Sequence, residues 1–195
     1  MREYMPGVGP PAGRQARTSP GGIMNNASKK DPAAEAEALE AVERHHASML
    51  RRLTALTDAL TGSVEKHDAP AEHDAHDVLL EWCENELVPH ALAEEGALYS
   101  GPRNSAEGRL LVEGMLAEHQ VIVSLVEELR GARGVAAAVA AGAIQRIFAL
   151  HLDKENRLLM PFVAASPGLS LAQSVSGLHE LVGEGHAHPP GSVHG

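Results

Sequence analysis

The sequence predicts an all-α protein: an antiparallel up-down-up-down four-helix bundle with a disordered N-terminal arm and a short C-terminal helix followed by a tail. Three observations support this class. Hydrophobic residues make up 44% of the 195 residues but aromatic residues only 3%, and the abundant Ala and Leu favour helices over sheets. Apolar residues recur at alternating steps of three and four in four long stretches. Short links between these stretches place consecutive helices antiparallel.

The first helix is expected to begin at Asp31 and Pro32. Asp accepts a hydrogen bond at the N-cap, and Pro at the first helical position lacks only an N–H that would have no helical partner. Gly62 is expected to end the helix. His45 lies on the shoulder of the inward stripe, whose only polar member is His46. The expected inward positions are Leu39, Val42, His46, Met49, Leu53, Leu56 and Leu60.

The second helix is expected over residues 71–99, with a local kink because Pro89 removes a backbone hydrogen bond one turn earlier. His73 and His76 look like a metal-binding pair in its first turn. His76 lies about 21 Å along the helix axis from His90 at 1.5 Å per residue, so it cannot share a site with it. We expect this first turn to be solvated. The inward positions are Leu80, Cys83, Leu87, His90, Glu94 and Ala97.

The third helix is expected to begin after Ser105, a good N-cap, and to end at a turn over residues 131–134. Its inward positions are Val112, Met115, His119, Ile122, Val126 and Leu129. The Ala-rich fourth helix has Pro161 near its end, and its inward positions are Ile144, Phe148, His151, Glu155, Leu158 and Phe162. A short fifth helix over residues 171–181, capped by Ser170, completes the prediction.

These elements divide the chain into three parts. Residues 1–30 are rich in Gly, Pro and Arg without apolar periodicity, which predicts a disordered arm. Residues 31–165 form the bundle, and residues 166–195 hold the short helix and a flexible, His-containing tail.

Charge and cysteine content exclude several classes of function. The formal net charge is −10, and no basic stripe follows any predicted helix, which argues against nucleic-acid binding. Cys83 is the only cysteine, so no internal disulfide can form and a reducing compartment fits. The chain has no uninterrupted run of about 18 apolar residues to span a membrane and no apolar signal segment. We therefore expect a soluble, cytoplasmic protein.

One motif, His-x-x-x-Glu, occurs twice, at His90–Glu94 and at His151–Glu155. Residues four apart lie on one helix face, about 6 Å apart, so each pair points an imidazole and a carboxylate the same way. A single inward histidine precedes each pair. Six polar groups are thereby predicted to face the bundle interior as metal ligands: His46, His90, Glu94, His119, His151 and Glu155.

Six buried polar groups of this kind need a cation among them, or else the carboxylates must bind protons, and we expect the cation. Two unpaired carboxylates inside a small bundle would be destabilised by several kcal/mol each, and the inward stripes contain no Lys or Arg. Mixed imidazole and carboxylate ligands suit iron, manganese or zinc. Two carboxylates can each bridge a pair of ions while two imidazoles bind each ion, so the ligand count favours a dinuclear centre. Cys83 lies about 10 Å from His90 along the axis and is assigned to the core.

The doubled motif, with the runs HALAEEGALY, AEHQVIVSLVEEL and FALHLDKENRLLMPFV, resembles the hemerythrin-like, HHE cation-binding family over about residues 36–165. This resemblance implies an antiparallel four-helix bundle around a non-haem centre of two iron ions. It also implies that His46 and His90 bind one iron, that His119 and His151 bind the other, and that Glu94 and Glu155 bridge them.

The chain departs from the oxygen carriers of that family at two positions. The carriers have His-x-x-x-His on the third helix, but here the fourth residue after His119 is Val123. They also have Asp five residues after their last His, whereas that position is Asn156 here and Glu155 takes the role. One imidazole is therefore missing, and the candidates to replace it are His45, Glu95 and Tyr99.

Two classes of function remain open at this stage. The first is a protein that binds or senses O₂, NO or peroxide at a di-iron centre without any organic substrate. The second is a di-iron oxidase, oxygenase or catalase-like enzyme. No flavin, nicotinamide or iron–sulfur motif and no Gly-rich loop is present in the sequence, so the electron donor and any protein partner stay unassigned.

Overall fold

The computed structural model describes residues 30–176, and this part of the chain contains helices and turns but no strand. The all-α prediction is therefore confirmed. The helices are α1 (Pro32–Glu65), α2 (Ala69–Trp82), η1 (Cys83–Leu87), α3 (Val88–Ala97), α4 (Ser100–Arg103), α5 (Ala106–Gly131), α6 (Val135–Lys154), η2 (Glu155–Leu159) and α7 (Met160–Ala165). A further helical turn over residues 171–176 matches the start of the expected fifth helix, whose remaining residues lie outside the described range.

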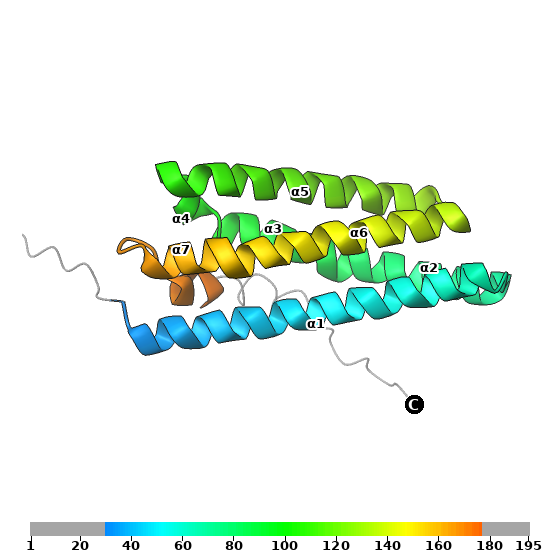
Figure 1. Cartoon of the computed structure of the whole chain (residues 1–195), viewed down its shortest axis with the longest axis horizontal. Helices are drawn as coiled ribbons and strands as arrows, with labels where there is room; N and C mark the ends of the chain where they lie inside the picture. The colour runs from blue at the N-terminus through cyan, green and yellow to red at the C-terminus, as the bar shows by residue number, and fades with distance from the viewer. Residues whose placement is uncertain (1–29, 177–195) are drawn as a thin grey trace, which may run out of the picture.

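Four long rods lie side by side in Figure 1: α1, the combined α2–η1–α3 segment, α5, and the combined α6–η2–α7 segment. Helix α1 packs against α2 and α6, and α5 packs against α6. The colour gradient in Figure 1 shows that the chain reverses direction at each connection between rods. This arrangement brings the middles of all four rods into contact with one interior.

The helix starts follow the sequence signals. Asp31, Asp68 and Ser105 each accept a hydrogen bond from a backbone N–H of the helix that follows, which satisfies donors that have no helical partner. The expected end of α1 at Gly62 is wrong, because the helix continues to Glu65. A glycine inside a helix is unfavourable by only about 1 kcal/mol, and the chain turns instead at His67, whose φ is 57°.

Two π-helical turns interrupt the rods that carry the His-x-x-x-Glu motifs. In η1 the Val88 N–H bonds to the carbonyl of Cys83, and in η2 the Met160 N–H bonds to that of Glu155. A proline follows each turn at the second position of the next helix, Pro89 and Pro161. Each π turn absorbs one extra residue, so the kink expected near Pro89 takes this form.

The second π turn changes which residues face inward. Leu158, expected to be inward, is 52% exposed, whereas Leu159 is fully buried. Because η2 contains an extra residue, the inward positions after Glu155 are shifted by one residue along the chain. Strict helical periodicity does not predict this shift.

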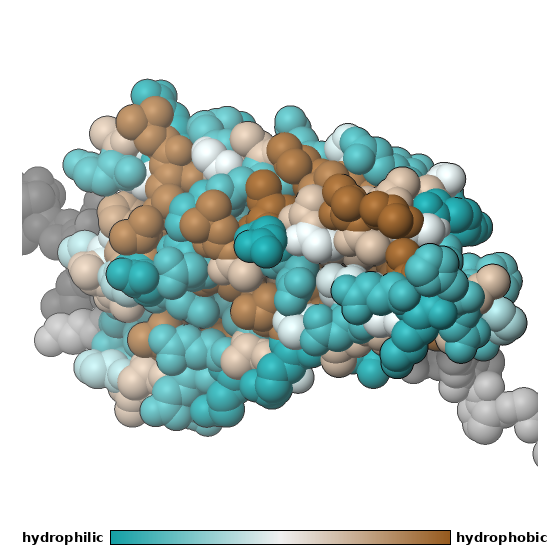
Figure 2. All heavy atoms as spheres, turned by 45° about the vertical axis from the view of Figure 1, so that its right-hand side comes forward, coloured by the Kyte–Doolittle hydropathy of each residue, from teal (hydrophilic) through white to brown (hydrophobic). Residues whose placement is uncertain are grey.

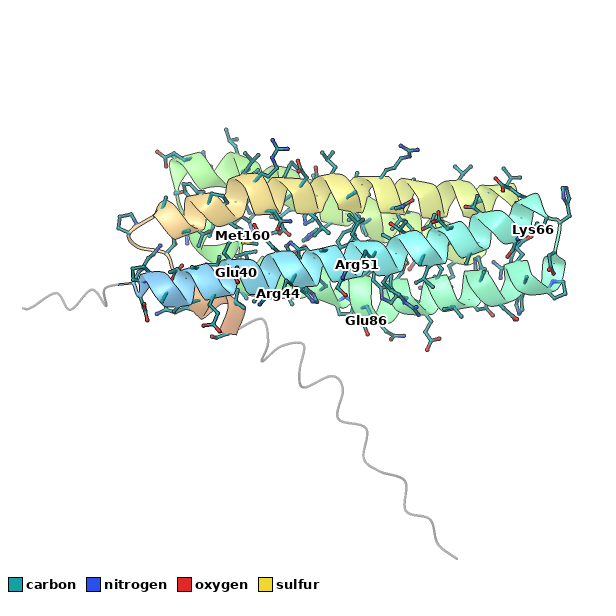
Figure 3. The ribbon with its side chains drawn as sticks, turned by 60° about the horizontal axis from the view of Figure 1, so that its bottom comes forward. Glu40, Arg44, Arg51, Lys66, Glu86 and Met160 are labelled. Atoms are coloured by element: carbon teal, nitrogen blue, oxygen red, sulfur yellow. The ribbon has the colours of Figure 1, made fainter. Side chains whose placement is uncertain are left out.

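Two apolar clusters surround a polar layer in the bundle. The larger cluster contains Leu53, Leu60, Leu87, Leu129 and Ile144, among others, and lies toward the α1–α2 and α5–α6 connections. The smaller cluster gathers Tyr99, Val112, Met115, Leu159 and Met160 at the opposite end. Charged side chains such as Glu40, Arg44 and Arg51 are exposed on the outer side of α1, while Met160 is buried (Figure 3).

The start of α1 is fastened to the end of the described chain. The Lys30 ammonium donates to the carbonyls of Val163 and Ala164 at 2.8 and 3.0 Å. The Glu35 carboxylate accepts from the Ser170 hydroxyl at 2.5 Å and from the Leu171 N–H at 2.8 Å. Residues far apart in the sequence therefore close this end of the bundle.

The segment Val135–Ala165 is long and apolar enough to pass a membrane-span test by length and composition. Arg146 and Asp153 lie within it, so it contains no uninterrupted run of about 18 apolar residues. It also carries the buried His151 and Glu155, and it packs one face against α1 and α5. Exposed apolar residues in Figure 2 are interspersed with hydrophilic ones.

Candidate metal centre

The structure brings the six predicted ligand residues together in one buried layer. Helix α1 contributes His46, α3 contributes His90 and Glu94, α5 contributes His119, α6 contributes His151, and η2 contributes Glu155. Each of these side chains is at most 4% exposed. Their burial follows from their places on the inward stripes, so the helix faces assigned from the sequence converge.

Glu94 lies between the two pairs of histidines. Its Oε1 atom is 3.0 Å from His90 Nε2 and 3.4 Å from His46 Nε2. Its Oε2 atom is 3.7 Å from His119 Nε2 and 3.8 Å from His151 Nε2. Each carboxylate oxygen thus faces a different pair of imidazoles.

Glu155 spans the same two halves from the other side. Its Oε2 atom is 3.5 Å from His46 Nε2, and its Oε1 atom is 3.6 Å from His151 Nε2. The Tyr99 hydroxyl donates to Oε1 of Glu155 at 2.5 Å and lies 3.1 Å from His151 Nε2. Tyr99 is therefore part of the layer.

The donor atoms satisfy the requirements of a metal site. Within the described residues, His46, His90 and Glu94 form one set of ligand atoms that could hold an ion, and Glu94, His119 and His151 form a second. Several buried polar atoms in the layer make no hydrogen bond: both ring nitrogens of His90, Oε2 of Glu94 and Oε2 of Glu155. His90 Nε2 is close to Glu94, but not in hydrogen-bonding geometry. Unsatisfied buried donors and acceptors are unfavourable by about 1–3 kcal/mol each, and a coordinated cation would satisfy them.

Electrostatics inside the layer favour positive charge. Burial lowers the pKa of His151, but the nearby carboxylates of Glu155 and Glu94 outweigh it and raise that pKa to about 10. The pKa of His46 is raised in the same way against the effect of burial. Burial raises the pKa of Glu94, yet the surrounding histidines hold it well below its usual range. The layer therefore keeps an ionised carboxylate where a cation would sit.

Three of the four histidines are oriented by a contact of their second ring nitrogen, Nδ1, with a residue outside the layer. His46 Nδ1 contacts Asn156 Oδ1 at 2.8 Å, and His119 Nδ1 contacts Glu95 Oε1 at 2.9 Å. His151 Nδ1 contacts Glu118 Oε2 at 3.1 Å. Such contacts direct the Nε2 atoms inward.

The three candidates for the missing imidazole lie at different distances from the centre. Tyr99 is inside it, with its hydroxyl beside Glu155 and His151. Glu95 contacts His119 on the far side of the ring. His45 is on the exposed side of α1, and its ring centroid lies 5.1 Å from that of His90. Val123, which stands at the position of the missing imidazole, is 41% exposed. Tyr99 lies two residues beyond the end of α3, so the regular spacing of that helix does not predict the direction of its side chain.

The expectation of a solvated first turn in α2 is wrong for His76. This residue is fully buried, and its Nε2 donates to the carbonyl of Leu129 at 2.7 Å. Nearby, Glu72 accepts from the N–H of Gly134 at 2.6 Å. The first turn of α2 packs against the α5–α6 connection, which sequence periodicity within α2 alone does not show. His73, by contrast, is exposed.

A helical bundle with a buried cluster of histidines and glutamates defines a metal-binding helical protein. The family model described as the hemerythrin HHE cation-binding domain matches residues 37–163. The chain belongs to this family, and the resemblance inferred from the two His-x-x-x-Glu motifs is confirmed. No curated protein and no solved structure matches the chain significantly.

Proposed function

We propose that the protein is a non-haem di-iron protein that binds or senses O₂, NO or peroxide. Its framework is an up-down-up-down four-helix bundle, and its proposed metal ligands are His46, His90, Glu94, His119, His151 and Glu155. One observation supports this proposal above the others: both carboxylates direct one oxygen to His46 and the other to His151. Carboxylates placed in this way can bridge two ions.

A single ion accounts less well for the ligand set. The two sets of ligand atoms share only Glu94 and draw their histidines from different pairs of helices. One ion would leave one pair of buried imidazoles without a partner. Two ions use all four imidazoles as terminal ligands, and the mixed nitrogen and oxygen donors suit iron.

The residues around the centre determine where a small molecule can reach it and which nearby group keeps a proton. A pair of iron ions would supply reversible electron transfer to a small bound molecule. A surface pocket of about 400 Å³, lined by Glu95, Tyr99, Ser100, Arg103, Leu116 and Gln120, adjoins the centre at Tyr99. Tyr99 separates this pocket from Glu155 and holds its proton, because burial and the neighbouring carboxylates raise its pKa. A small polar molecule would therefore approach the centre at the phenol.

The same pocket favours a second candidate function, a di-iron oxidase, oxygenase or catalase-like enzyme. The Tyr99 hydroxyl lies between the pocket and the carboxylate of Glu155, where it could donate a hydrogen bond to a small molecule bound at the centre. Binding or sensing remains the first proposal because it needs neither an organic substrate nor an electron donor.

Metal analysis and optical spectroscopy test both proposals. Aerobically purified protein is expected to contain about two irons per chain and to show absorption bands of an oxo-bridged ferric pair. Dithionite, O₂ and peroxide should then change the spectrum. One stoichiometric change supports binding or sensing, and consumption of peroxide or O₂ over many turnovers supports the enzyme. One zinc per chain, or no metal, would refute the di-iron proposal.

The proposed setting is the cytoplasm, without nucleic-acid or membrane partners. The net charge of −10 and the single buried thiol of Cys83 support it. Burial and the nearby Glu84 raise the pKa of that thiol to about 12, so it stays protonated and unreactive at neutral pH.

A further inference from the structure

The four histidines of the centre differ in what their second ring nitrogen contacts. In the His119/His151 pair, both Nδ1 atoms contact carboxylates, those of Glu95 and Glu118. In the His46/His90 pair, His46 contacts the neutral amide of Asn156. His90 Nδ1 has no hydrogen-bond partner among the residues that the structure describes.

This difference affects how strongly each imidazole binds a metal. An Nδ1–H that donates to a carboxylate makes the Nε2 atom of the same ring a stronger donor. A neutral amide polarises the ring less, and an absent partner does not polarise it at all. Loss of such outer partners typically lowers metal affinity by about 10–100-fold.

Glu118 is the more buried of the two outer carboxylates. Its side chain is 16% exposed, and the Lys154 ammonium contacts its other oxygen and holds it in place. Glu95 is 37% exposed, so water screens its charge more. Both residues act through a histidine and are positioning residues rather than ligands.

We propose that the two metal positions are unequal. The position formed by His119 and His151 fills first and holds its ion more tightly, and the position formed by His46 and His90 holds the more labile ion. Glu118 and Glu95 are the positioning residues behind this order. The inference rests on the proposed two-ion centre.

Anaerobic titration of the metal-free protein with ferrous iron, followed by calorimetry, tests the order. The unmodified chain is expected to bind two ions in two resolved steps. His151→Ala should remove the tighter step, and His46→Ala should remove the weaker one.

Exchanges of the outer residues then separate charge from shape. Glu118→Gln keeps a hydrogen-bond acceptor of the same size but loses the negative charge, and it should weaken only the tighter step by about 10–100-fold. Asn156→Asp gives His46 a carboxylate partner and should strengthen the weaker step. Glu127→Gln is the matched control, because Glu127 lies on α5 but pairs with Arg130 away from the centre, and it should change neither step.

The outcomes distinguish this inference from the proposed function. If the unmodified chain binds one ion or none, the two-ion centre itself fails. If two ions bind with equal affinity, or if Glu118→Gln weakens both steps alike, the inequality fails while the two-ion centre stands. Melting temperatures of the metal-free variants identify a general structural effect, which would also count against a role confined to one position.

Discussion

Two layers of the same bundle are equally buried but differ in whether their groups have partners. The larger apolar cluster, which includes Leu53, Leu60 and Leu129, is held by contacts among hydrocarbon side chains. The polar layer around Glu94 and Glu155 contains buried atoms without hydrogen-bond partners. The apolar layers are therefore complete in themselves, whereas the polar layer has groups that a bound cation would satisfy.

Removal of a central carboxylate should have the largest effect. Glu94→Ala deletes the group that faces all four histidines, so we expect essentially all bound metal to be lost. Metal analysis by mass spectrometry measures this loss. Near-normal metal content would show that Glu94 is not a ligand.

A large truncation in the apolar layer should lower stability but leave the metal content unchanged. Leu53 is fully buried in the larger cluster, and Leu53→Ala should lower the free energy of unfolding by about 2–5 kcal/mol. Urea denaturation of the metal-free protein measures it. The metal content of the folded variant should stay unchanged, and a loss of metal would mean that the two layers are coupled.

His76 sharpens the comparison because it is a buried histidine outside the polar layer. His76→Ala removes its hydrogen bond to Leu129, and this change should lower the free energy of unfolding by about 1–3 kcal/mol. Metal content should not change, whereas it should fall in His90→Ala. Equal metal loss in the two variants would contradict the assignment of helix faces.

The smallest effect is expected at the closed end of the bundle. Burial raises the pKa of Glu35, but hydrogen bonds from Ser170 and Leu171 and the charge of Lys30 leave it below the usual value of 4.5. An ionised Glu35 therefore stabilises the fold above that value, and this contribution is lost as the pH falls through the lowered pKa. Glu35→Gln should flatten the acid side of a plot of melting temperature against pH. An unchanged acid limb would show that Glu35 contributes nothing.

Much of this architecture could be predicted because its signals are local. The Asp31 and Ser105 caps act within a few residues, and the helix faces of His46, His90 and Glu94 follow from the period of one helix. The convergence of the inward stripes then brings the six residues together. The division into arm, bundle and tail, and the role of these residues as ligands, stay predictions.

The features that were missed depend on contacts between helices or on irregular backbone. His76 is buried because the α5–α6 connection covers it. Tyr99 is one of three candidates for the missing imidazole, and what singles it out from His45 and Glu95 is the path of the chain beyond the regular end of α3. Leu159 replaces Leu158 in the core because η2 holds an extra residue. None of these facts follows from the spacing of residues within one helix.

The π turn η1 has a consequence for tolerance to insertions and deletions. It lies between Leu79, which packs in the larger apolar cluster, and the ligands of α3. Deletion of one residue there could be absorbed by conversion of the turn to regular α-helix, whereas conversion with every residue kept would rotate everything downstream by about 100°. His90 and Glu94 would swing out of the interior while the apolar packing upstream stayed in register. By absorbing one extra residue, η1 allows Leu79 before it and the ligands of α3 after it to face the same interior.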